Sequence, residues 1–285
     1  MLDSSAEGPP QHKETKTSLP LSFPLSLLPD EVALSCLARV PRSDYIALSL
    51  VSKKYRSLVC LPALYKKRSI LGFTEDCFYI CLSSGGYESS PVWLIFHREK
   101  RFMIPIPTLL PQLPRGSSVV VLDGKIYVIG GLSGTKHSSS DVFLLDCRSH
   151  TWHCVPSMSV PRSFSAAGVV DGKIYVIGGC RTIDLSLCYG EVFDPKTQTW
   201  ETLVPITDHN TKKLFDYNHV YDESLVIEDK VYALHRARGV YYSPHEAKWE
   251  LTENDVWRLR FQNHCCVMEK LLYGCDDYGD VFWCE

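Results

Sequence analysis

The chain has 285 residues, of which 45% are hydrophobic and 22% charged, and its formal net charge is −3. This length predicts two domains, and the nearly balanced charge argues against nucleic acid as the main partner because no basic face or tail stands out. The sequence has no run of about 18 apolar residues and no apolar segment behind a basic start, so we expect neither a membrane span nor a secretory signal.

The N-terminal segment, residues 1–20, consists mainly of Ser, Pro, Lys, Glu and Thr. Such a segment buries too little apolar surface to offset the entropy that a chain loses when it becomes ordered. We therefore expect residues 1–20 to be disordered.

A helical pattern follows and extends over residues 21–68. Pro29 followed by Asp30 is a typical helix start, and Pro41 ends this first helix. Apolar positions between them follow helical spacing: Val32, Cys36, Leu37 and Val40. Three more short helices are expected, at about 44–50, 52–59 and 63–69.

The helical domain carries two motifs, Leu28-Pro29-Asp30-Glu31 and the run from Leu48 to Arg56. With these motifs it resembles the F-box, although that family often has Trp where this chain has Tyr55. F-box modules dock on the small Skp-type adaptor of cullin–RING ubiquitin ligases, through apolar side chains that so small a bundle leaves exposed. The resemblance implies an adaptor-binding set of six residues: Leu28, Pro29, Leu48, Leu50, Val51 and Tyr55. The alternative is a helical cap whose leucines only pack the bundle.

Extended segments replace helices after residue 75. Three of them, at 77–82, 92–97 and 101–106, are rich in aromatic and aliphatic residues and are expected to be strands. Together they predict an incomplete sheet over 77–107.

An internal repeat of 48 residues then dominates the chain. Asp-Gly-Lys-Ile-Tyr-Val-Ile-Gly-Gly occupies 123–131 and recurs unchanged at 171–179, and Trp152 recurs as Trp200. Asp-Gly supplies the positive φ angles of a two-residue hairpin turn, and the paired glycines allow close backbone approach. Each copy has four extended pieces, which in the first copy are 118–122, 125–129, 141–146 and 151–155. The structural positions of the repeat are Gly130, Gly131, Trp152, Gly178, Gly179 and Trp200, and we expect each Trp to pack between neighbouring sheets.

This unit resembles the kelch repeat, whose pattern is a strand, Gly-Gly, a variable loop, a further strand and then Trp. The resemblance implies that each copy is a four-stranded blade of a β-propeller. A duplication within an ordinary β-sandwich is the alternative, but a period of 40–50 residues favours a propeller. The expected repeats are kelch 1 at about 117–163, kelch 2 at about 164–206, a degenerate kelch 3 at about 223–252 and a partial kelch 4 at about 256–285.

The expected fold class is therefore multidomain, α plus all-β: a small helical F-box bundle followed by a partial kelch β-propeller over 75–285. This combination resembles the large plant family of F-box/kelch-repeat proteins, with a short C-terminus. Propellers of that family usually have about six blades. We therefore expect an open, C-shaped ring whose unpaired edges, near 77–82 and 280–284, favour self-association.

Loops on a rigid propeller scaffold are the expected place for target recognition. The variable loops are 132–140, 180–189 and 208–222. Four residues are candidate target contacts: His137, Arg162, Arg181 and Lys212. Arg162 belongs to a Pro-Arg pair that also occurs at Pro114-Arg115, and it is expected to face the propeller entrance. Each of these residues has an ordinary solvated loop position as its alternative.

Catalytic and metal sites are not expected. The sequence has no Ser-His-Asp signature, and no helix follows the Gly-Gly pairs, so they do not form a phosphate-binding loop. The twelve cysteines show no disulfide framework, which predicts reduced thiols in the cytoplasm or nucleus. Cys77 and Cys81 lack a second ligand pair at zinc-site spacing, so we expect no metal and no cofactor.

The family resemblance implies a substrate-recognition subunit of an SCF-type (Skp–cullin–F-box) ubiquitin ligase, with no catalytic activity of its own. The F-box would bind the Skp-type adaptor and through it the cullin, and the kelch loops would bind a target protein that the sequence does not identify. Nucleic acid and membrane are not expected partners. Two alternatives stay open: a kelch-type interaction scaffold without a ligase role, and a truncated, weakly functional family member.

Overall fold

The structure is a computed structural model. It describes residues 28–75, 77–82, 92–97, 102–106, 114–133, 137–180, 189–212, 221, 223–235, 238–252, 264–268, 271–275 and 281–284. The chain divides into two compact units, Met1–Thr74 and Glu75–Glu285. The disorder expected over 1–20 lies outside the described residues. None of the described helices combines the length and the apolar character that a membrane crossing requires.

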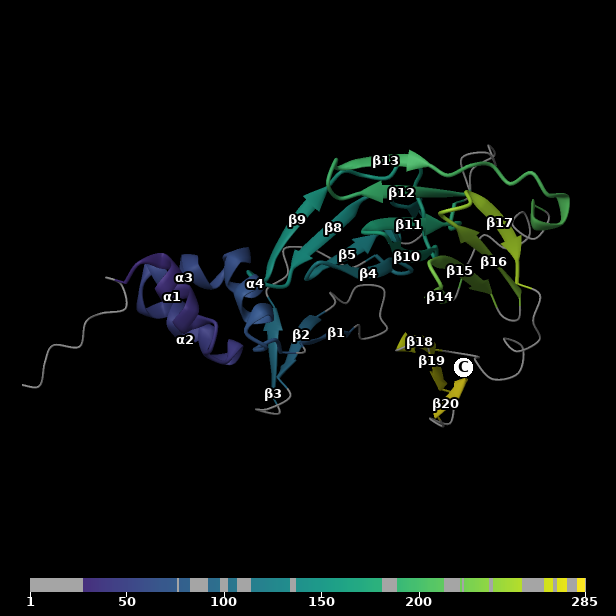
Figure 1. Ribbon diagram of the computed structural model, residues 1–285. Helices are drawn as coiled ribbons and strands as arrows, with labels where there is room; N and C mark the ends of the chain where they lie inside the picture. The colour runs from purple at the N-terminus through teal and green to yellow at the C-terminus, as the bar shows by residue number, and fades with distance from the viewer. Residues whose placement is uncertain are drawn as a thin grey trace, which may run out of the picture. The chain divides into compact units, whose positions relative to one another are not determined.

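Short helices build the first unit (Figure 1). They are α1 (Asp30–Leu37), η2 (Arg42–Asp44), α2 (Tyr45–Val51), α3 (Lys53–Val59) and α4 (Pro62–Ile70). The Ser52 side chain caps α3 by accepting a hydrogen bond from the Tyr55 backbone nitrogen at 3.2 Å, and Pro62 starts α4. The helices bury a common apolar core: Ala33, Leu37, Ala38, Tyr45, Tyr55, Leu58, Val59 and Leu64.

A buried arginine closes the end of α1. Arg68 on α4 is 4% exposed, and its Nη1 atom donates to the carbonyl oxygens of Ala38 (3.1 Å) and Val40 (2.6 Å). The same nitrogen donates to the Tyr45 hydroxyl at 3.0 Å, and that hydroxyl donates to the Leu37 carbonyl at 2.8 Å. Because the last carbonyls of a helix have no partner within it, these bonds satisfy the end of α1 and fix α4 against it.

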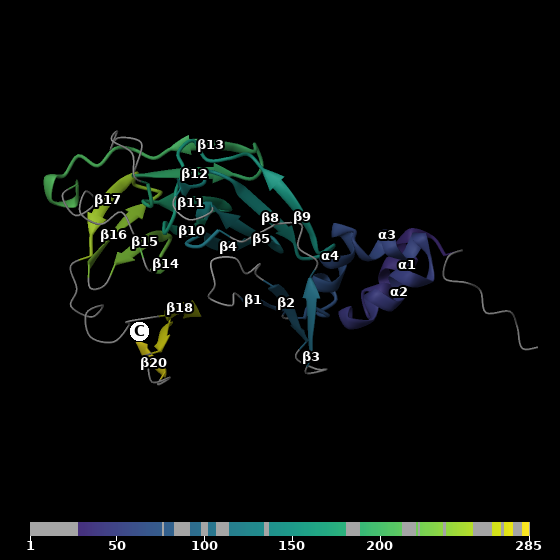
Figure 2. The same ribbon diagram turned by 180° about the vertical axis from the view of Figure 1, so that it is seen from behind.

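Antiparallel sheets build the second unit, and each sheet is made from strands close together in the chain (Figures 1 and 2). The first sheet contains β1 (Phe78–Leu82), β2 (Val92–His97) and β3 (Phe102–Ile106). The second contains β4 (Ser118–Leu122), β5 (Lys125–Ile129), β8 (Val142–Asp146) and β9 (Thr151–Val155). The third contains β10 (Ala166–Val170), β11 (Lys173–Ile177), β12 (Gly190–Asp194) and β13 (Thr199–Thr202). The fourth contains β14 (Glu223–Ile227), β15 (Lys230–His235), β16 (Arg238–Ser243) and β17 (Lys248–Leu251), and the fifth contains β18 (His264–Met268), β19 (Leu271–Cys275) and β20 (Val281–Cys284).

Two-residue hairpin turns join the first two strands of the repeated sheets. Asp123 and Gly124 have φ angles of 51° and 69°, and Asp171 and Gly172 have φ angles of 50° and 72°. Positive φ at both central residues is the geometry that matches the right-handed twist of the flanking strands. The turn therefore fixes the register in which Leu122 pairs with Lys125, and in this register the paired residues Val120 and Tyr127 are both buried.

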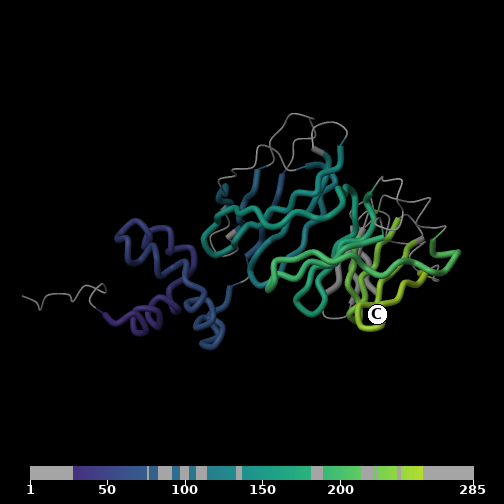
Figure 3. The backbone as a smooth tube through the Cα atoms, turned by 90° about the horizontal axis from the view of Figure 1, so that it is seen from above, coloured from purple at the N-terminus to yellow at the C-terminus, as the bar shows by residue number. Residues whose placement is uncertain are grey.

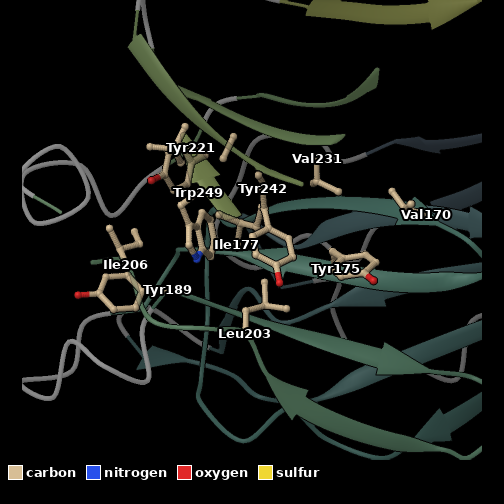
Figure 4. Packing of buried hydrophobic residues seen from close by; sticks show 13 residues of the cluster. Val170, Tyr175, Ile177, Tyr189, Leu203, Ile206, Tyr221, Val231, Tyr242 and Trp249 are labelled. Atoms are coloured by element: carbon tan, nitrogen blue, oxygen red, sulfur yellow. The ribbon is translucent and has the colours of Figure 1, made fainter. Parts of the chain in front are cut away.

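The sheets pack face to face in chain order, and Figure 3 follows the chain through the first four of them. Strand β4 contacts β10, and β10 contacts β14. Trp93 and Ile95 of the first sheet share one apolar cluster with Val128 and Leu145 of the second. Figure 4 shows the corresponding cluster between the third and fourth sheets, to which these residues contribute: Val170, Tyr175, Ile177, Tyr189, Val231, Tyr242 and Trp249.

In the third and fourth sheets, the Trp of the last strand ties the sheet to the segment that leaves the preceding one. Trp200 Nε1 donates to the Pro156 carbonyl at 2.8 Å, and Trp249 Nε1 donates to the Val204 carbonyl at 2.8 Å. Trp152 is partly buried and packs edge-on against Trp93, with ring centroids 5.6 Å apart. The fixed spacing of Trp in the sequence therefore reflects a repeated contact between sheets.

The paired glycines stand where the backbone leaves no room for a side chain. At Gly130 (φ 60°), a Cβ atom would lie 2.4 Å from the Arg162 carbonyl oxygen. A Cβ atom at Gly131 (φ 101°) or at Gly179 (φ 74°) would also lie closer to its neighbours than real Cβ atoms do. A Cβ at Gly178 (φ 70°) would lie 2.2 Å from the ring of Tyr221, a residue just before β14. Close approach therefore explains the pairs: the first glycine of each pair faces the segment that leads into the next sheet, and the second faces the segment that leads into its own sheet.

Gly178→Ala is expected to destabilise the second unit more than Gly172→Ala. The φ angles, 70° and 72°, are nearly equal, and this conformation alone costs an L residue about 1–2 kcal/mol. Nothing lies within 4 Å of a Cβ at Gly172, whereas Gly178 also faces Tyr221. We expect a cost of about 1 kcal/mol for Gly172→Ala and about 2–3 kcal/mol for Gly178→Ala in urea unfolding followed by tryptophan fluorescence. Equal losses of unfolding free energy in the two variants would contradict the close approach of Tyr221 to Gly178.

The expected architecture, a helical bundle followed by antiparallel sheets, agrees with the structure. The strands expected in the first repeat coincide with β4, β5 and β9, and β8 starts one residue later than expected. Sequence patterns did not show the small hairpin of β6 (Leu132–Ser133) and β7 (His137–Ser138), which lies inside the variable loop expected at 132–140. Strands β1 and β20 belong to separate sheets, and the open ring stays a prediction.

Candidate protein-interaction surfaces

An apolar corner projects from the helical unit where α2 meets α3. Ser52 is extended (φ −156°, ψ 158°), so the chain turns sharply between the two helices. Leu50 and Val51, at the end of α2, are 75% and 69% exposed, and Ile46 one turn earlier is 51% exposed. Ile46 and Leu50 lie on the same side of the helix because they are four residues apart. We call Ile46, Leu50 and Val51 the α2 corner.

Polar contacts hold this region in place. Lys54 Nζ forms an ion pair with Asp30 Oδ1 at 3.0 Å and donates to the Leu28 carbonyl at 3.2 Å. Arg56 Nε donates to the Ser49 carbonyl at 3.1 Å, which joins α3 to α2. The segment that opens the helical unit therefore lies beside α3, the helix that follows the α2 corner.

The six residues expected to bind the adaptor fall into two groups. Pro29, Leu50 and Val51 are exposed, whereas Leu28 and Leu48 are partly buried against the bundle core. Tyr55 is 7% exposed and belongs to that core, so its position does not fit the expected adaptor contact. Its spacing to Leu58 and Val59, which are also buried, was the signal in the sequence that places it on the inner face. Sequence reasoning also missed Ile46, which its spacing to Leu50 could have revealed.

An ion pair is fully buried between the second and third sheets. Arg162 is 0% exposed, and its Nε and Nη2 atoms lie 3.1 and 3.0 Å from Glu191 Oε1 on β12. Its Nη1 atom donates to the Gly178 carbonyl at 2.7 Å. Glu191 also accepts hydrogen bonds from the backbone nitrogens of Ser159 (2.7 Å) and Val160 (3.2 Å). Burial lowers the pKa of Arg162, and the Glu191 charge acts in the opposite direction.

The backbone of Arg162 also forms hydrogen bonds, to residues that follow strand β5 of the second sheet. Its nitrogen donates to the Ser139 carbonyl at 3.0 Å, and its carbonyl accepts from the Gly131 nitrogen at 2.8 Å. Main chain and side chain therefore contact different sheets. The expectation that Arg162 faces the propeller entrance as a target contact does not fit this position, because the guanidinium is enclosed by protein groups. Its counterpart Arg115 is exposed and bridges Leu132 only through its backbone.

The other candidate target contacts are on loops. His137 is exposed on the β6–β7 hairpin, and Lys212 is exposed at the end of a short helical turn over 209–212. Asp208 caps that turn: its Oδ2 atom accepts hydrogen bonds from the backbone nitrogen and hydroxyl of Thr211, both at 2.7 Å. These bonds lower the pKa of Asp208. Arg181 lies outside the described residues.

A strained phenylalanine lies where the inner strands begin. Phe164 has φ 55°, a conformation that bulky L residues rarely adopt, and Gly116 has φ 73° one repeat earlier. The Phe164 nitrogen donates to the Gly116 carbonyl at 2.7 Å, and its own carbonyl accepts from the Tyr221 nitrogen at 2.9 Å. These bonds connect three consecutive sheets just before β4, β10 and β14. Sequence reasoning missed Phe164, and the only available signal was the glycine at the equivalent position.

Hydroxyl groups surround this junction but bond to one another. Ser118 and Ser165 have their Oγ atoms 2.8 Å apart, and so do Ser138 and Ser163. Such pairs satisfy buried polar atoms and leave no activated nucleophile, since no base contacts them among the described residues. The described residues also contain no group of three or more His, Cys, Asp or Glu that could hold a metal ion. Cys180, which is 1% exposed, is disulfide-bonded, so the expectation of reduced thiols is wrong for it. Sequence spacing does not reveal which cysteines a fold brings together.

Comparisons with known proteins identify both units. An F-box domain family model matches residues 25–67, and a kelch-repeats domain family model (FKB95) matches residues 87–285. F-box/kelch-repeat protein At4g33900 of Arabidopsis thaliana is 37% identical over 278 residues, which cover 90% of this chain and 70% of the relative. F-box/kelch-repeat protein At4g19870 of the same plant is 37% identical over 310 residues, which cover 97% of this chain and 74% of the relative. The chain is therefore shorter than these relatives.

A solved structure shows the same fold in a distant sequence. The chain described as "Structure of YjhT" matches with a TM-score of 0.52 and 15% identity, over 70% of this chain and 71% of that one. At this identity the likeness concerns the fold alone. Together with the two family-model matches, it confirms the expected fold class, a helical F-box region followed by the antiparallel sheets of a kelch domain.

Proposed function

The chain belongs to the F-box/kelch-repeat protein family, and we propose that it is a substrate-recognition subunit of an SCF-type ubiquitin ligase. Members of this family are typically non-catalytic substrate adaptors of such ligases. In this proposal the helical unit binds a Skp-type adaptor and through it the cullin, and the kelch unit binds a target protein in the cytoplasm or nucleus. Its contribution is proximity, because holding the target near the ligase raises its effective concentration.

The α2 corner is the observation that carries the proposal. Three large apolar side chains on adjacent turns stay in water although the bundle has a well-formed core beside them. Clustered exposed apolar side chains on a small domain mark an interaction surface. The ion pair of Lys54 with Asp30 also keeps Leu28 and Pro29 beside α3, so both expected motifs contribute to one region.

Target recognition is proposed for the loops of the kelch unit. His137 and Lys212 present polar side chains from separate loops, and Phe164 presents a partly exposed aromatic ring between the sheets. A strained residue is retained where the surrounding structure over-determines it, often at a functional site. Phe164 therefore replaces the buried Arg162 among the proposed target contacts. Aromatic anchors flanked by polar residues are typical of protein–protein interfaces.

Replacing both Leu50 and Val51 by Ala is expected to weaken binding to a Skp-type adaptor by about 2 kcal/mol or more, which is roughly 30-fold in the dissociation constant. The stability of the chain should barely change, because both side chains are mostly exposed. Isothermal titration of the full chain with a purified Skp-type adaptor measures the effect. The matched control is Ile70→Ala, which removes a side chain that is 74% exposed at the end of α4.

The titration distinguishes the proposed ligase role from the alternative roles. Undiminished affinity of the Leu50/Val51 variant would contradict the role of the α2 corner. If the unaltered chain did not bind the adaptor at all, an interaction scaffold without a ligase role would become the better description.

A further inference from the structure

A row of four side chains crosses the backbone segments around the β6–β7 hairpin. Arg115 forms a bridge with Leu132 on β6, and Leu132 pairs with Ser138 on β7. The hydroxyl oxygens of Ser138 and Ser163 are 2.8 Å apart, so Ser163 continues the row on the far side of β7. Directly opposite residues of paired strands point to the same side. We call Arg115, Leu132, Ser138 and Ser163 the Arg115 row.

The two ends of the Arg115 row meet at Phe164. This residue follows Ser163, and its backbone nitrogen donates to the carbonyl of Gly116, which follows Arg115, at 2.7 Å. A Cβ atom at Gly116 would lie 2.9 Å from ring atoms of Phe164, so the ring rests against the Gly116 backbone. A partly exposed aromatic ring therefore lies next to the charged end of the row.

Arg115 carries a charge that no described residue neutralises. Its side chain is exposed and forms neither an ion pair nor a hydrogen bond within the described part of the chain. The buried Arg162, by contrast, has Glu191 as its counter-charge. A guanidinium presents its donors in a planar fork that matches the two oxygens of a carboxylate. Arg115 is therefore available to bind an anionic group from another molecule.

The hydroxyl pair of the row has one donor left over. Ser138 and Ser163 share a single hydrogen bond, which uses only one of their two hydroxyl hydrogens. In the neighbouring pair, Ser118 also donates to the Ser165 carbonyl, so both hydrogens are used. Among the described residues, the second hydrogen of the Ser138–Ser163 pair has no acceptor, although Ser163 is only 7% exposed. A partly enclosed donor of this kind favours an incoming anion, because charged acceptors form the stronger hydrogen bonds.

We propose that the Arg115 row binds a carboxylate side chain, Asp or Glu, of the target protein; this rests on the proposed role of the kelch unit in target binding. Neighbouring strands lie about 4.8 Å apart, so the backbones of Arg115 and Ser138 are about 10 Å apart across Leu132. A carboxylate above Leu132 accepts from the Arg115 guanidinium on one side and from the hydroxyl pair on the other. Phe164 contacts an apolar side chain beside the acidic one.

The charge of the row favours a carboxylate over the other common anionic group of proteins, a phosphate ester. A phosphorylated side chain carries a charge of about −1.5 to −2 at neutral pH and is typically bound by a cluster of arginines. The Arg115 row contains one arginine, and its other three side chains are neutral. It therefore balances the single charge of Asp or Glu.

An array of short synthetic peptides, probed with the fluorescently labelled full chain, tests the proposal. Each spot holds peptides of mixed sequence with one fixed central residue: Asp, Glu, Asn, Gln, Lys or phosphoserine. Asp and Glu spots should bind about three- to tenfold more chain than Asn and Gln spots. Arg115→Met should bring this ratio to about one, and Arg115→Glu should reverse the preference toward Lys. Arg115→Lys keeps the charge and should retain part of the preference for acidic residues.

Lys196→Met and Lys196→Glu are the matched controls. They make the same changes of charge at an exposed position in the turn between β12 and β13, outside the row, and should keep the preference for acidic residues. Ser163→Ala should lower binding to the Asp and Glu spots about two- to threefold, because it removes the left-over donor. Circular dichroism checks that every variant is folded.

Three outcomes overturn the proposal: equal binding or no binding at Asp and Asn spots, an acidic preference that survives in Arg115→Glu, and selection of phosphoserine without selection of Glu. A parallel titration with a Skp-type adaptor separates this result from the ligase role. If the adaptor binds and no acidic preference appears, the carboxylate site is wrong and the ligase role stands. An acidic preference in a chain that does not bind the adaptor would support the site and contradict the ligase role.

Discussion

Replacing Arg162 by Met is expected to lower the free energy of unfolding of the kelch unit by about 3–5 kcal/mol, the cost of removing one partner from a buried ion pair. The substitution leaves the Glu191 carboxylate enclosed at 0% exposure without its counter-charge. It also removes the donor to the Gly178 carbonyl. Both effects act between the second and third sheets, so we expect these sheets to lose protection together in hydrogen exchange.

A double-mutant cycle shows how much of this cost is the pair itself. Glu191→Leu should also be strongly destabilising, because it removes the acceptor for the backbone nitrogens of Ser159 and Val160. The double variant should cost less than the two single costs added together, since a hydrophobic pair has no unbalanced charge. It should still be less stable than the natural chain, because three backbone groups lose their partners.

Arg115→Met is the matched control for Arg162→Met. Arg115 belongs to the equivalent Pro-Arg pair, but its side chain is exposed, so its removal should change stability by no more than about 0.5 kcal/mol. Similar costs for the two arginine variants in urea unfolding would show that the burial of Arg162 has little energetic consequence.

Trp200→Ala is expected to cost about 3 kcal/mol, near the lower end of the range for large aromatic residues because the ring is only partly buried. The substitution removes the ring that packs on Phe193, with centroids 5.0 Å apart, and the hydrogen bond to the Pro156 carbonyl. Trp200→Phe keeps a ring and loses the bond, so it should cost about 1 kcal/mol plus the smaller packing area. An unchanged thermal midpoint for Trp200→Ala would mean that the ring is free to serve as a ligand platform.

Strand positions were predictable from sequence because local chemistry determines them. The Asp123-Gly124 turn, with a short run of β-branched, aliphatic and aromatic residues on either side, fixes a hairpin without help from distant parts of the chain. The second copy of the repeat forms the same hairpin turn at Asp171-Gly172. Loop interiors such as the β6–β7 hairpin carry no such pattern, because their two strands have only two residues each.

The positions of Arg162 and Phe164 depend on distant partners, whereas that of Tyr55 does not. Glu191, which buries Arg162, lies 29 residues further along the chain, and the repeat gives no hint because Phe143 occupies the corresponding place in the preceding copy. The burial of Tyr55 was readable from its helical phase, since it shares a face with Leu58 and Val59. The conformation of Phe164 follows from its bonds to neighbouring sheets, which no short stretch of sequence encodes.

Each of two tryptophans bonds to a residue much earlier in the chain, and this affects the order in which the sheets assemble during synthesis. Trp200 and Trp249 each bond to a carbonyl 44 or 45 residues earlier in the chain, so a sheet is secured only after the next one has left the ribosome. At about 5–20 residues per second, this delay lasts roughly 2–9 s. Throughout that interval the newest sheet presents an uncovered apolar face to solvent. We therefore expect the kelch unit to assemble from its N-terminal end, one sheet at a time, with the most recently made sheet the last to lose its exposure to solvent.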